Sequence, residues 1–295
     1  MSMKRVSDIL DSIRRGLRRP EVRRHPIQAI TRRMAWRWHW KRQPDTPIVL
    51  KDWWRGLSIV LPHTGNSSLV FYRRHSDEGM VWLLQVLLSP GMTFLDIGAH
   101  IGEFTLMGAE MVSAGGKAVA VEPLPPCAET IRKNAALNRM NQVAVFTGAL
   151  SDRCGKIGFV SDSARSSGWI AKGPDPVAFE SDCWTLDELL SRSGMQRVAV
   201  LKLDTNGNEL AALRGGAGVL REGRVGNIVM KLYHPDVTRS RFGYDAHESV
   251  KLLREWGFLL KIVKGHDAYP VGQPEDIDRH FNPLVYCHLL VATKA

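Results

Sequence analysis

The sequence predicts an α/β fold built on a doubly wound, mostly parallel sheet, and two observations lead to this class. From residue 93 onward, short runs rich in Val, Ile and Leu alternate with segments of helical periodicity. Such apolar runs are typical of parallel strands that are buried on both faces between helices. The chain also has 295 residues, 44% of them hydrophobic, which suffices for one large domain or two small ones.

The strands and helices of this domain, residues 93–295, follow one another in regular order. Strand 93–97 precedes a helix over 102–112, and strand 117–122 precedes a helix over 125–138. The remaining expected strands are 142–146, 198–204, 227–233, 258–264 and 285–293, and the remaining helices are 207–220 and 246–257. Because ligands of doubly wound sheets bind at the carboxyl ends of the parallel strands, we expect the site to lie there.

Two further segments lie outside this alternation. A preface at residues 46–92 comes first, and its expected elements are short strands at 57–62 and 67–74 and a helix at 77–88. A long, partly structured insertion then separates residue 152 from strand 198–204, and it contains a helix opened by Thr185, with Glu188 three residues later. An insertion at the binding edge of a sheet is expected to contribute substrate contacts.

A basic leader occupies residues 1–45. Residues 1–42 hold 13 Lys and Arg against 3 Asp and Glu (13 − 3 = +10), which accounts for the whole formal charge of +10. The rest of the chain is therefore neutral, whereas a domain that binds nucleic acid is typically basic, so its charge argues against a nucleic-acid substrate. Apolar residues recur at helical spacing and predict a short amphipathic helix; they are Val6, Ile9, Leu10, Ile13 and Leu17.

Three tryptophans, Trp36, Trp38 and Trp40, stand among arginines at the end of this leader. One interpretation is a segment that rests on an anionic membrane surface, with its rings at the level of the lipid headgroups. The other is a helix packed on its own domain with its charges in solvent. Contact with nucleic acid is a third and weaker interpretation.

The stretch "FLDIGAHIGEFTL", residues 94–106, joins the first strand of the domain to its helix. Gly98 and Gly102 allow a tight turn in which a ligand can lie against main-chain N–H groups. The next strand ends in Glu122, 26 residues after Asp96, where a carboxylate can accept hydrogen bonds from both hydroxyls of a ribose. The pair indicates a nucleoside ligand.

The spacing of the motif distinguishes between two such ligands. It is D-x-G-x-x-x-G, whereas a dinucleotide site has G-x-G-x-x-G. A carboxylate at Asp96 repels a pyrophosphate but suits the ammonium group of an amino acid. S-adenosyl-L-methionine has a ribose, a base and such an ammonium, so it is favoured over NAD, which stays as an alternative.

Cysteine and hydropathy patterns bear on the compartment. The four cysteines lie far apart without a CxxC pair, so neither a zinc site nor a disulfide framework is suggested, and no metal is expected. The longest apolar stretch, residues 80–88, is about half the roughly 20 residues that a membrane span needs. We expect a cytoplasmic protein, with the leader as a peripheral contact to the inner face of the membrane.

Several motifs in order give the chain a resemblance to a known family. "FLDIGAHIGEFT", "AVEPLP", "KNAALN", "GALSD", "TLDELL" and "LKLDTNGNELAALRGG" succeed one another as in the FkbM-type methyltransferases, over roughly residues 55–292. The resemblance implies a Rossmann-like methyltransferase sheet with an antiparallel last strand, and an S-adenosylmethionine-dependent O-methyltransferase acting on hydroxyls of sugars or secondary metabolites, often in polysaccharide biosynthesis.

The resemblance also implies roles for particular residues. Asp96, Gly98 and Gly102 would hold the methionine end of the donor, Glu122 the ribose, and Ala149 with its neighbours the adenine. His100 lies within the glycine turn, where the family more often has Asn, and is assigned to cofactor contact or to the turn itself.

The sequence departs from the family at two strand ends. The family usually has K-x-D-x-E-G-x-E where this chain has "KLDTNGNE", so Asn206 replaces a carboxylate, while Lys231 stands where another acid is common. Asn206 is also a good helix N-cap, and Glu209 then sits where a capping-box acid belongs. Glu209 therefore stays open between a structural and a catalytic role.

A hydroxyl loses a proton as it attacks the methyl group, so a base within hydrogen-bond reach favours the reaction. Asp204, which also lies beside the expected donor site, and His234, just after the next strand, are the candidates. We expect methylation of a small-molecule or glycan acceptor. The alternative is a binding or scaffold protein of glycan assembly that has kept the fold while its acids were replaced. The oligomeric state is not determined by the sequence.

Overall fold

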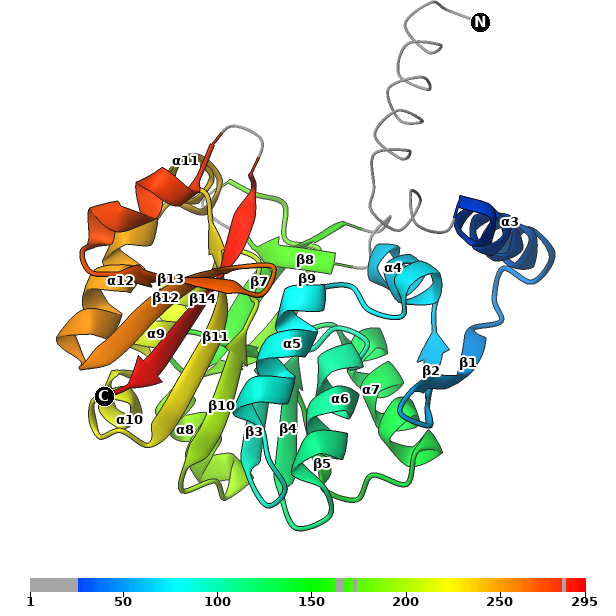
Figure 1. Cartoon of the computed structure of the whole chain (residues 1–295), viewed down its shortest axis with the longest axis horizontal. Coiled ribbons are helices and arrows are strands. Elements are labelled where there is room, and N and C mark those ends of the chain that lie inside the picture. The colour runs from blue at the N-terminus through cyan, green and yellow to red at the C-terminus, as the bar shows by residue number, and fades with distance from the viewer. Residues whose placement is uncertain (1–25, 163–166, 172–173, 283–284) are drawn as a thin grey trace, which may run out of the picture.

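The computed structural model describes residues 26–162, 167–171, 174–282 and 285–295. Its centre is an eight-stranded sheet in the order β13-β12-β14-β11-β10-β3-β4-β5 (Figure 1). The strands are β3 (Thr93–Ile97), β4 (Lys117–Glu122), β5 (Val143–Thr147), β10 (Val198–Leu203), β11 (Val225–Tyr233), β12 (Phe258–Lys264), β13 (Asp267–Val271) and β14 (Cys287–Lys294). The five strands from β11 to β5 are mutually parallel, and β14 runs antiparallel to both β11 and β12. The predicted sheet, with its antiparallel last strand, is confirmed.

Helices cover both faces of the sheet, because side chains alternate between the faces along each strand. Leu95 and Ile97 of β3 belong to one buried core, and Phe94 belongs to the other. The first core is completed by α8 (Leu186–Ser193), α9 (Glu209–Arg214), α10 (Ala217–Arg221) and α12 (Ala246–Glu255). The second is completed by α5 (Glu78–Leu87), α6 (Glu103–Val112) and α7 (Pro125–Leu137), which lie in front of the sheet in Figure 1. This arrangement is the doubly wound architecture that the alternation predicted.

One expected helix is divided in two. Residues 207–220 form α9 and α10, separated by Gly215 and Gly216. A Cβ on Gly215 would lie 2.0 Å from the carbonyl oxygen of Ser151, so the backbone passes too close to the insertion for any larger residue. The prediction of a single helix is therefore wrong, because tertiary contact with another segment interrupts it.

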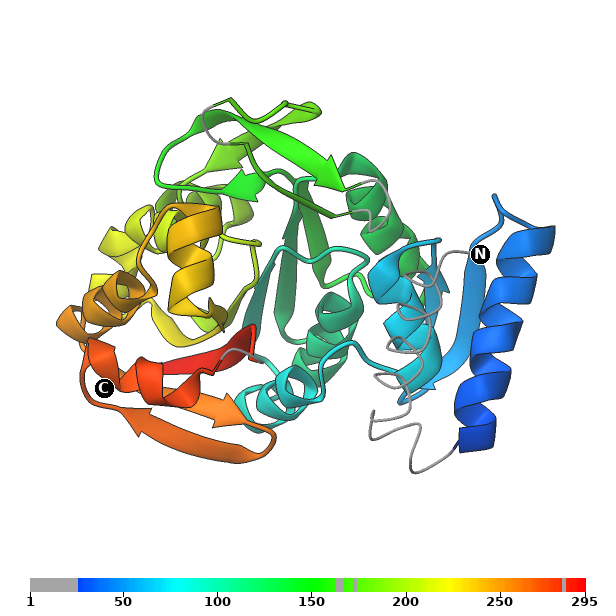
Figure 2. The same ribbon diagram turned by 90° about the horizontal axis from the view of Figure 1, so that it is seen from above.

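The insertion after β5 forms a second, four-stranded sheet in the order β6-β9-β7-β8. Its strands are β6 (Ala149–Leu150), β7 (Gly155–Asp162), β8 (Ser167–Ile170) and β9 (Phe179–Trp184). Seen from above in Figure 2, this sheet (green) lies at the top of the view and the helix α3 (Pro26–Arg42, blue) at the right. Thr185 accepts a hydrogen bond from the Glu188 amide and so starts α8, as predicted.

The preface differs from its prediction at residues 67–74 and in having an additional strand, β1 (Ile48–Trp54). Residues 67–74, expected to be a strand, belong instead to α4 (Gly65–Arg73). The Thr64 hydroxyl accepts a hydrogen bond from the Ser67 amide, and Arg74 ends the helix in the left-handed conformation. These caps outweigh the strand preference of the aromatic and β-branched residues between them. The other elements of the preface are a hairpin of β1 (Ile48–Trp54) with β2 (Leu57–Leu61), and the predicted helix α5.

The described part of the leader is one helix, α3 (Pro26–Arg42), at the far right of Figure 1. Trp36 and Trp40 are buried in the same core as α5 and α6, and Trp40 stacks on His63 with ring centroids 4.4 Å apart. Trp38 is 58% exposed. The predicted amphipathic stripe from Val6 to Leu17 lies outside the described residues. Over the described ranges, no helix is long and apolar enough to span a membrane.

Candidate active site

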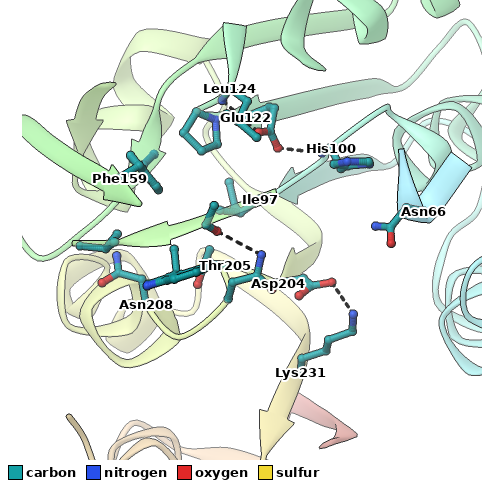
Figure 3. Close-up of a pocket in the computed structure, with 18 of the residues that line it drawn as sticks. Asn66, Ile97, His100, Glu122, Leu124, Phe159, Asp204, Thr205, Asn208 and Lys231 are labelled. Atoms are coloured by element: carbon teal, nitrogen blue, oxygen red, sulfur yellow. Dashed lines mark hydrogen bonds and ion pairs between the residues drawn. The ribbon is translucent and has the colours of Figure 1, made fainter. Parts of the chain in front are cut away.

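A cavity of about 780 Å³ opens at the carboxyl ends of β3, β4, β10 and β11. Its volume falls within the range of about 300–1,000 Å³ that small-molecule and cofactor sites occupy. The wall is completed by the small sheet, by α4 and by α3, so segments far apart in the chain contribute to it. Figure 3 shows the strand-end residues around this space.

The turn after β3 brings the ends of two parallel strands together. The Asp204 amide donates to the Ile97 carbonyl over 3.1 Å, and Gly98 follows with a φ of +73°. A Cβ on Gly98 would lie 1.9 Å from the Asp204 carbonyl oxygen, so only glycine fits. Gly98 lines the cavity, whereas Gly102 lies against Ile131 of α7 and sets the packing of α6.

Glu122, at the end of β4, is held in a fixed orientation. One carboxylate oxygen accepts from the Leu124 amide (3.0 Å) and the other from the His100 amide (2.8 Å), as the dashed lines of Figure 3 show. Glu122 is 4% exposed, and this burial raises its pKa to about 7 although the two amides oppose the shift. A carboxylate fixed in this way at the cavity wall has lone pairs left for the two hydroxyls of a ribose.

A surface lined by apolar side chains continues from Glu122. Ala149 and Leu150, just beyond β5, line it together with Leu124 and with Phe159 of the small sheet. The Asn208 side chain donates to the Leu150 carbonyl over 2.7 Å and fixes this edge. A planar base fits such a surface, in agreement with the adenine contact predicted for Ala149.

The structure corrects the position of Asp96. Asp96 and Lys202 are paired residues on neighbouring strands, and their side chains form a buried ion pair of 2.7 Å. The second Asp96 oxygen accepts from the Thr105 hydroxyl of α6 over 2.7 Å. Asp96 is completely buried and is not among the residues that line the cavity. It braces β3 against β10 and α6, and a direct contact with the methionine ammonium has no support in this geometry.

Asp204 is the acid that reaches the cavity at this end. Its carboxylate lies 2.8 Å from the Lys231 ammonium, the residue that replaces an acid of the family (Figure 3). Burial alone would raise the pKa of Asp204, but the charges of Lys231 and Lys202 outweigh burial and hold it below its usual value. Within the described ranges, no group of three or more His, Cys, Asp or Glu is arranged to hold a metal ion.

Glu209 and Asn206 hold the loop that follows Asp204. Glu209 is buried and accepts hydrogen bonds from the amides of Thr205 and Gly207 and from the Tyr244 hydroxyl. It does not line the cavity, so its contacts favour the structural alternative. We predicted Asn206 as the N-cap of this helix, but the N-cap of α9 is Asn208.

The Asn206 side chain forms hydrogen bonds with two other segments of the chain. It adopts a φ of +54°, a conformation that Asn tolerates better than most residues. Its amide donates to the Gly168 carbonyl of the small sheet, and its oxygen accepts from the Tyr233 hydroxyl, each over 3.3 Å. A carboxylate could not donate to Gly168. The departure from the family at this position therefore ties the small sheet to β11.

The two predicted histidines lie in different places. His100 lines the cavity with a φ of +53°, while its backbone amide binds Glu122. His234 instead starts the short helix α11 (Pro235–Val237) by accepting from the Asp236 amide, and its ring packs against Phe281. Since His234 does not line the cavity, the structure gives no support to its predicted role as the base.

Several lining residues were missed by the sequence analysis. Arg33 and Arg37 of α3 belong to the wall, as do Asn66 and Tyr72 of α4. Arg241, far from them in the sequence, also lines the cavity. The arginines of α3 carried a signal, since they are four residues apart and so share a face of the helix. Nothing local in the sequence indicates that this face meets the carboxyl ends of the sheet.

The doubly wound sheet has a glycine turn after β3 and an acid at the end of β4. Together with the strand order, these features define a nucleoside-binding enzyme of the methyltransferase type. The family model described as the methyltransferase FkbM domain matches residues 96–260, more than half of the chain. The chain belongs to the FkbM methyltransferase family. Its methyl donor is S-adenosylmethionine, and Glu122, Gly98 and the apolar surface at Ala149 fit the ribose, the close backbone approach and the base of that donor.

Comparison with solved structures finds methyltransferases at low sequence identity. The FkbM methyltransferase from Methylobacillus flagellatus KT is 12% identical with a TM-score of 0.44, over 77% of this chain and 54% of that one. An S-adenosylmethionine-dependent O-methyltransferase from Thermotoga maritima is 12% identical with a TM-score of 0.44, over 84% and 78%. Precorrin-6y C5,15-methyltransferase from Geobacter metallireducens GS-15 is 14% identical with a TM-score of 0.41, over 73% and 87%. Comparison with curated protein sequences gives no match.

We expect the affinity for S-adenosylhomocysteine to fall about tenfold when the pH is lowered from 8 to 6. Since the pKa of Glu122 is raised to about 7, its carboxyl group in the free protein is charged at pH 8 and mostly protonated at pH 6. Only the charged form accepts from both ribose hydroxyls, so binding strengthens as the pH rises through about 7, and one pKa unit corresponds to a factor of about ten. Calorimetry at both pH values measures the change.

The control for this pH dependence is Glu122→Gln. The amide is uncharged at every pH, so binding should be weaker than in the parent at pH 8 and should not change between pH 8 and pH 6. A flat profile in the parent, or the same slope in Glu122→Gln, would contradict the assignment of Glu122 to the ribose.

Proposed function

We propose that the chain is an O-methyltransferase that methylates a hydroxyl group of a sugar, a glycan precursor or a secondary metabolite. The observation that carries this proposal is the part of the cavity wall that the donor-binding residues do not form. This part includes Tyr72, Tyr233, Tyr286 and Asn66. Aromatic rings with hydroxyl groups and a side-chain amide suit a ligand that has both apolar faces and many hydroxyls.

The residues of the chain act mainly by positioning. Bound S-adenosylmethionine supplies an electrophilic methyl group. Asp204 has a pKa below its usual value, so at neutral pH it is a weak proton acceptor, and its negative charge is available to the cationic donor. Holding the acceptor hydroxyl in line with the methyl group is then the main contribution, and such orientation is worth about 7–11 kcal/mol in well-aligned intramolecular reactions.

Replacement of His234 by alanine should leave at least about a third of the parental turnover. The ring packs on Phe281 outside the cavity, and the loss of a general base would instead lower turnover about 10²–10⁴-fold. Turnover measured from pH 5.5 to 8.5 tests this expectation. A fall of that order, together with loss of a limb of the pH–rate profile, would restore His234 as the base.

The decisive experiment supplies the purified full chain with methyl-labelled S-adenosylmethionine and separate pools of glycans, nucleotide sugars and secondary metabolites. We expect label in one pool, in a linkage that survives mild alkali, because methyl ethers are stable where methyl esters are hydrolysed. Glu122→Ala is the matched control and should transfer little label. Label in an alkali-labile or nitrogen-linked product would overturn O-methylation.

A second candidate is a binding protein of glycan assembly without turnover, which the replacements at Asn206 and Lys231 favour. Asn206 is accounted for by its two hydrogen bonds, and Lys231 by its pair with Asp204. This candidate predicts that S-adenosylhomocysteine binds while no pool is ever labelled.

We further propose that the leader contacts an anionic membrane surface from the cytoplasmic side. The outer face of α3 exposes large apolar side chains at helical spacing: Ile27 (77% exposed), Ile30 (55%), Met34 (64%) and Trp38 (58%). Arg42 stacks on Trp38 at 4.3 Å, which places a cation beside this stripe. A helix with an apolar stripe among arginines suits the boundary between anionic headgroups and acyl chains.

Flotation with liposomes tests the membrane contact. The full chain should float with vesicles containing phosphatidylserine, and it should be released by salt, since each Lys or Arg near the surface contributes about 1 kcal/mol that screening removes. The double variant Ile30→Ser/Trp38→Ser, altered only on the exposed stripe, should float less. Equal flotation of parent and variant, or equal binding to phosphatidylcholine vesicles, would rule out this surface.

A further inference from the structure

The arginines of α3 that face the cavity differ in their surroundings from the arginines of the fold that pair with a carboxylate. Examples of such pairs are Arg55 with Glu110, Arg192 with Glu188, Arg214 with Glu248 and Arg239 with Asp236. Arg33 and Arg37 line the cavity, and among the described residues neither forms an ion pair. Arg33 lies over the ring of Tyr72, 5.7 Å from its centroid.

A third arginine lines the cavity from another segment. Arg241 belongs to a turn of π-helix, Thr238–Phe242, and donates to the Tyr286 hydroxyl over 3.2 Å. It lies over the ring of Trp169 of the small sheet at 5.0 Å, and it too has no ion-pair partner in the part of the chain that the structure describes. Aromatic rings and a hydroxyl therefore hold the guanidinium groups of Arg33 and Arg241 in place without neutralising them.

The charge of the cavity is consequently positive. Its described lining has four permanent cations and two acids, which is an excess of two (4 − 2 = +2), and Glu122 is partly protonated near neutral pH. The cations are Arg33, Arg37, Lys231 and Arg241, and the acids are Glu122 and Asp204. The donor adds a sulfonium and an ammonium against one carboxylate. A neutral acceptor would leave this excess uncompensated in a partly enclosed space.

We infer that the acceptor carries an anionic group, a phosphate or a carboxylate, that is bound by Arg33 and Arg37, with Arg241 as a third cation in the cavity wall. The inference rests on the proposed function, since it gives the class of acceptor for the same site. Guanidinium groups bind such anions through paired hydrogen bonds, and Arg at both positions matches this preference. The source of the anion is either a soluble sugar phosphate or acid, or a sugar joined to a lipid through phosphate.

The test measures binding to the full chain saturated with S-adenosylhomocysteine. The soluble probes are glucose 1-phosphate, glucuronic acid and neutral methyl glucoside, and the lipid probe is an isoprenoid-linked sugar phosphate in detergent micelles. We expect at least one anionic probe to bind tenfold or more tightly than methyl glucoside, and its affinity to fall as salt is raised. Preference for glucose 1-phosphate or glucuronic acid identifies a soluble acceptor, and preference for the micellar probe a lipid-linked one.

The matched variants are Arg33→Gln/Arg37→Gln on the cavity face of α3 and Arg214→Gln, an exposed arginine of α9 that does not line the cavity. The double variant should lose at least tenfold affinity for the anionic probe, while Arg214→Gln should not. Affinity for S-adenosylhomocysteine should stay within twofold in all of them, which shows that the fold and the donor site persist.

Three results would overturn the inference: equal binding of anionic and neutral probes, equal loss in Arg214→Gln, or a parallel loss of donor affinity in the double variant. Anion binding at Arg33 and Arg37 without any labelled product in the transfer assay would instead count against the proposed function alone. Methyl transfer to a neutral acceptor would count against the anionic acceptor alone.

Discussion

Replacement of Lys202 by methionine is expected to lower the free energy of unfolding by about 3–5 kcal/mol. Lys202 and Asp96 are an ion pair with side chains only 2% and 0% exposed, and the Lys202 ammonium also donates to the Gly98 carbonyl over 3.2 Å. Without the ammonium, the Asp96 carboxylate stays buried with the Thr105 hydroxyl as its described hydrogen-bond partner. Urea unfolding of the full chain measures the loss.

The double variant Lys202→Met/Asp96→Asn provides the control. It removes both charges at similar shape, and exchange of a buried ion pair for neutral groups often costs little. We therefore expect it to be more stable than Lys202→Met alone, with a positive coupling in the double-mutant cycle. If the single and double variants were equally destabilised, the loss would come from packing, and the buried charge of Asp96 would not be its cause.

Asp204→Asn is expected to weaken S-adenosylmethionine binding about 10- to 100-fold, because a hydrogen bond to a charged group contributes about 1.5–3 kcal/mol. The variant keeps the shape of the side chain but leaves the Lys231 ammonium unpaired beside a cationic donor. S-adenosylhomocysteine lacks the sulfonium charge, so its affinity should fall less than that of S-adenosylmethionine. Calorimetry with both ligands gives the two values.

Lys231→Met distinguishes the role of the Asp204 charge in donor binding from a role of Asp204 as general base. It removes the cation and leaves Asp204 negative, so donor binding should not weaken, in contrast to Asp204→Asn. If Asp204→Asn kept the donor affinity of the parent while turnover fell about 10²–10⁴-fold, Asp204 would be the general base that the sequence suggested.

Much of the sheet could be predicted because its signals are local. Every expected strand from 93–97 to 285–293 corresponds to a strand of the structure, since buried parallel strands need continuous apolar runs. The strand predicted at 67–74 was wrong because Thr64 and Arg74 cap a helix there. The single helix at 207–220 was wrong because Gly215 passes against Ser151, which is 64 residues earlier in the chain (215 − 151 = 64).

The candidate site was predictable only in part. Gly98, Glu122 and Ala149 stand at strand ends where the motifs placed them, and all three line the cavity. Asp96 is one residue before the end of its strand, so its side chain lies between the sheet and α6. There it contacts Lys202, which is 106 residues away, and Thr105 of α6. A motif shows that an acid is present, but it does not show which face of the sheet the acid meets.

The sequence by itself determined the class of fold, the nucleoside-binding turn and the concentration of positive charge in the first 42 residues, because these depend on composition, periodicity and short spacings. Tertiary structure alone decided which charges share the cavity. Lys231 pairs with Asp204, His234 lies outside the wall, and one face of α3 brings Arg33 and Arg37 to the strand ends. These relations arise where the chain folds back on itself, and contacts between distant segments leave no local pattern.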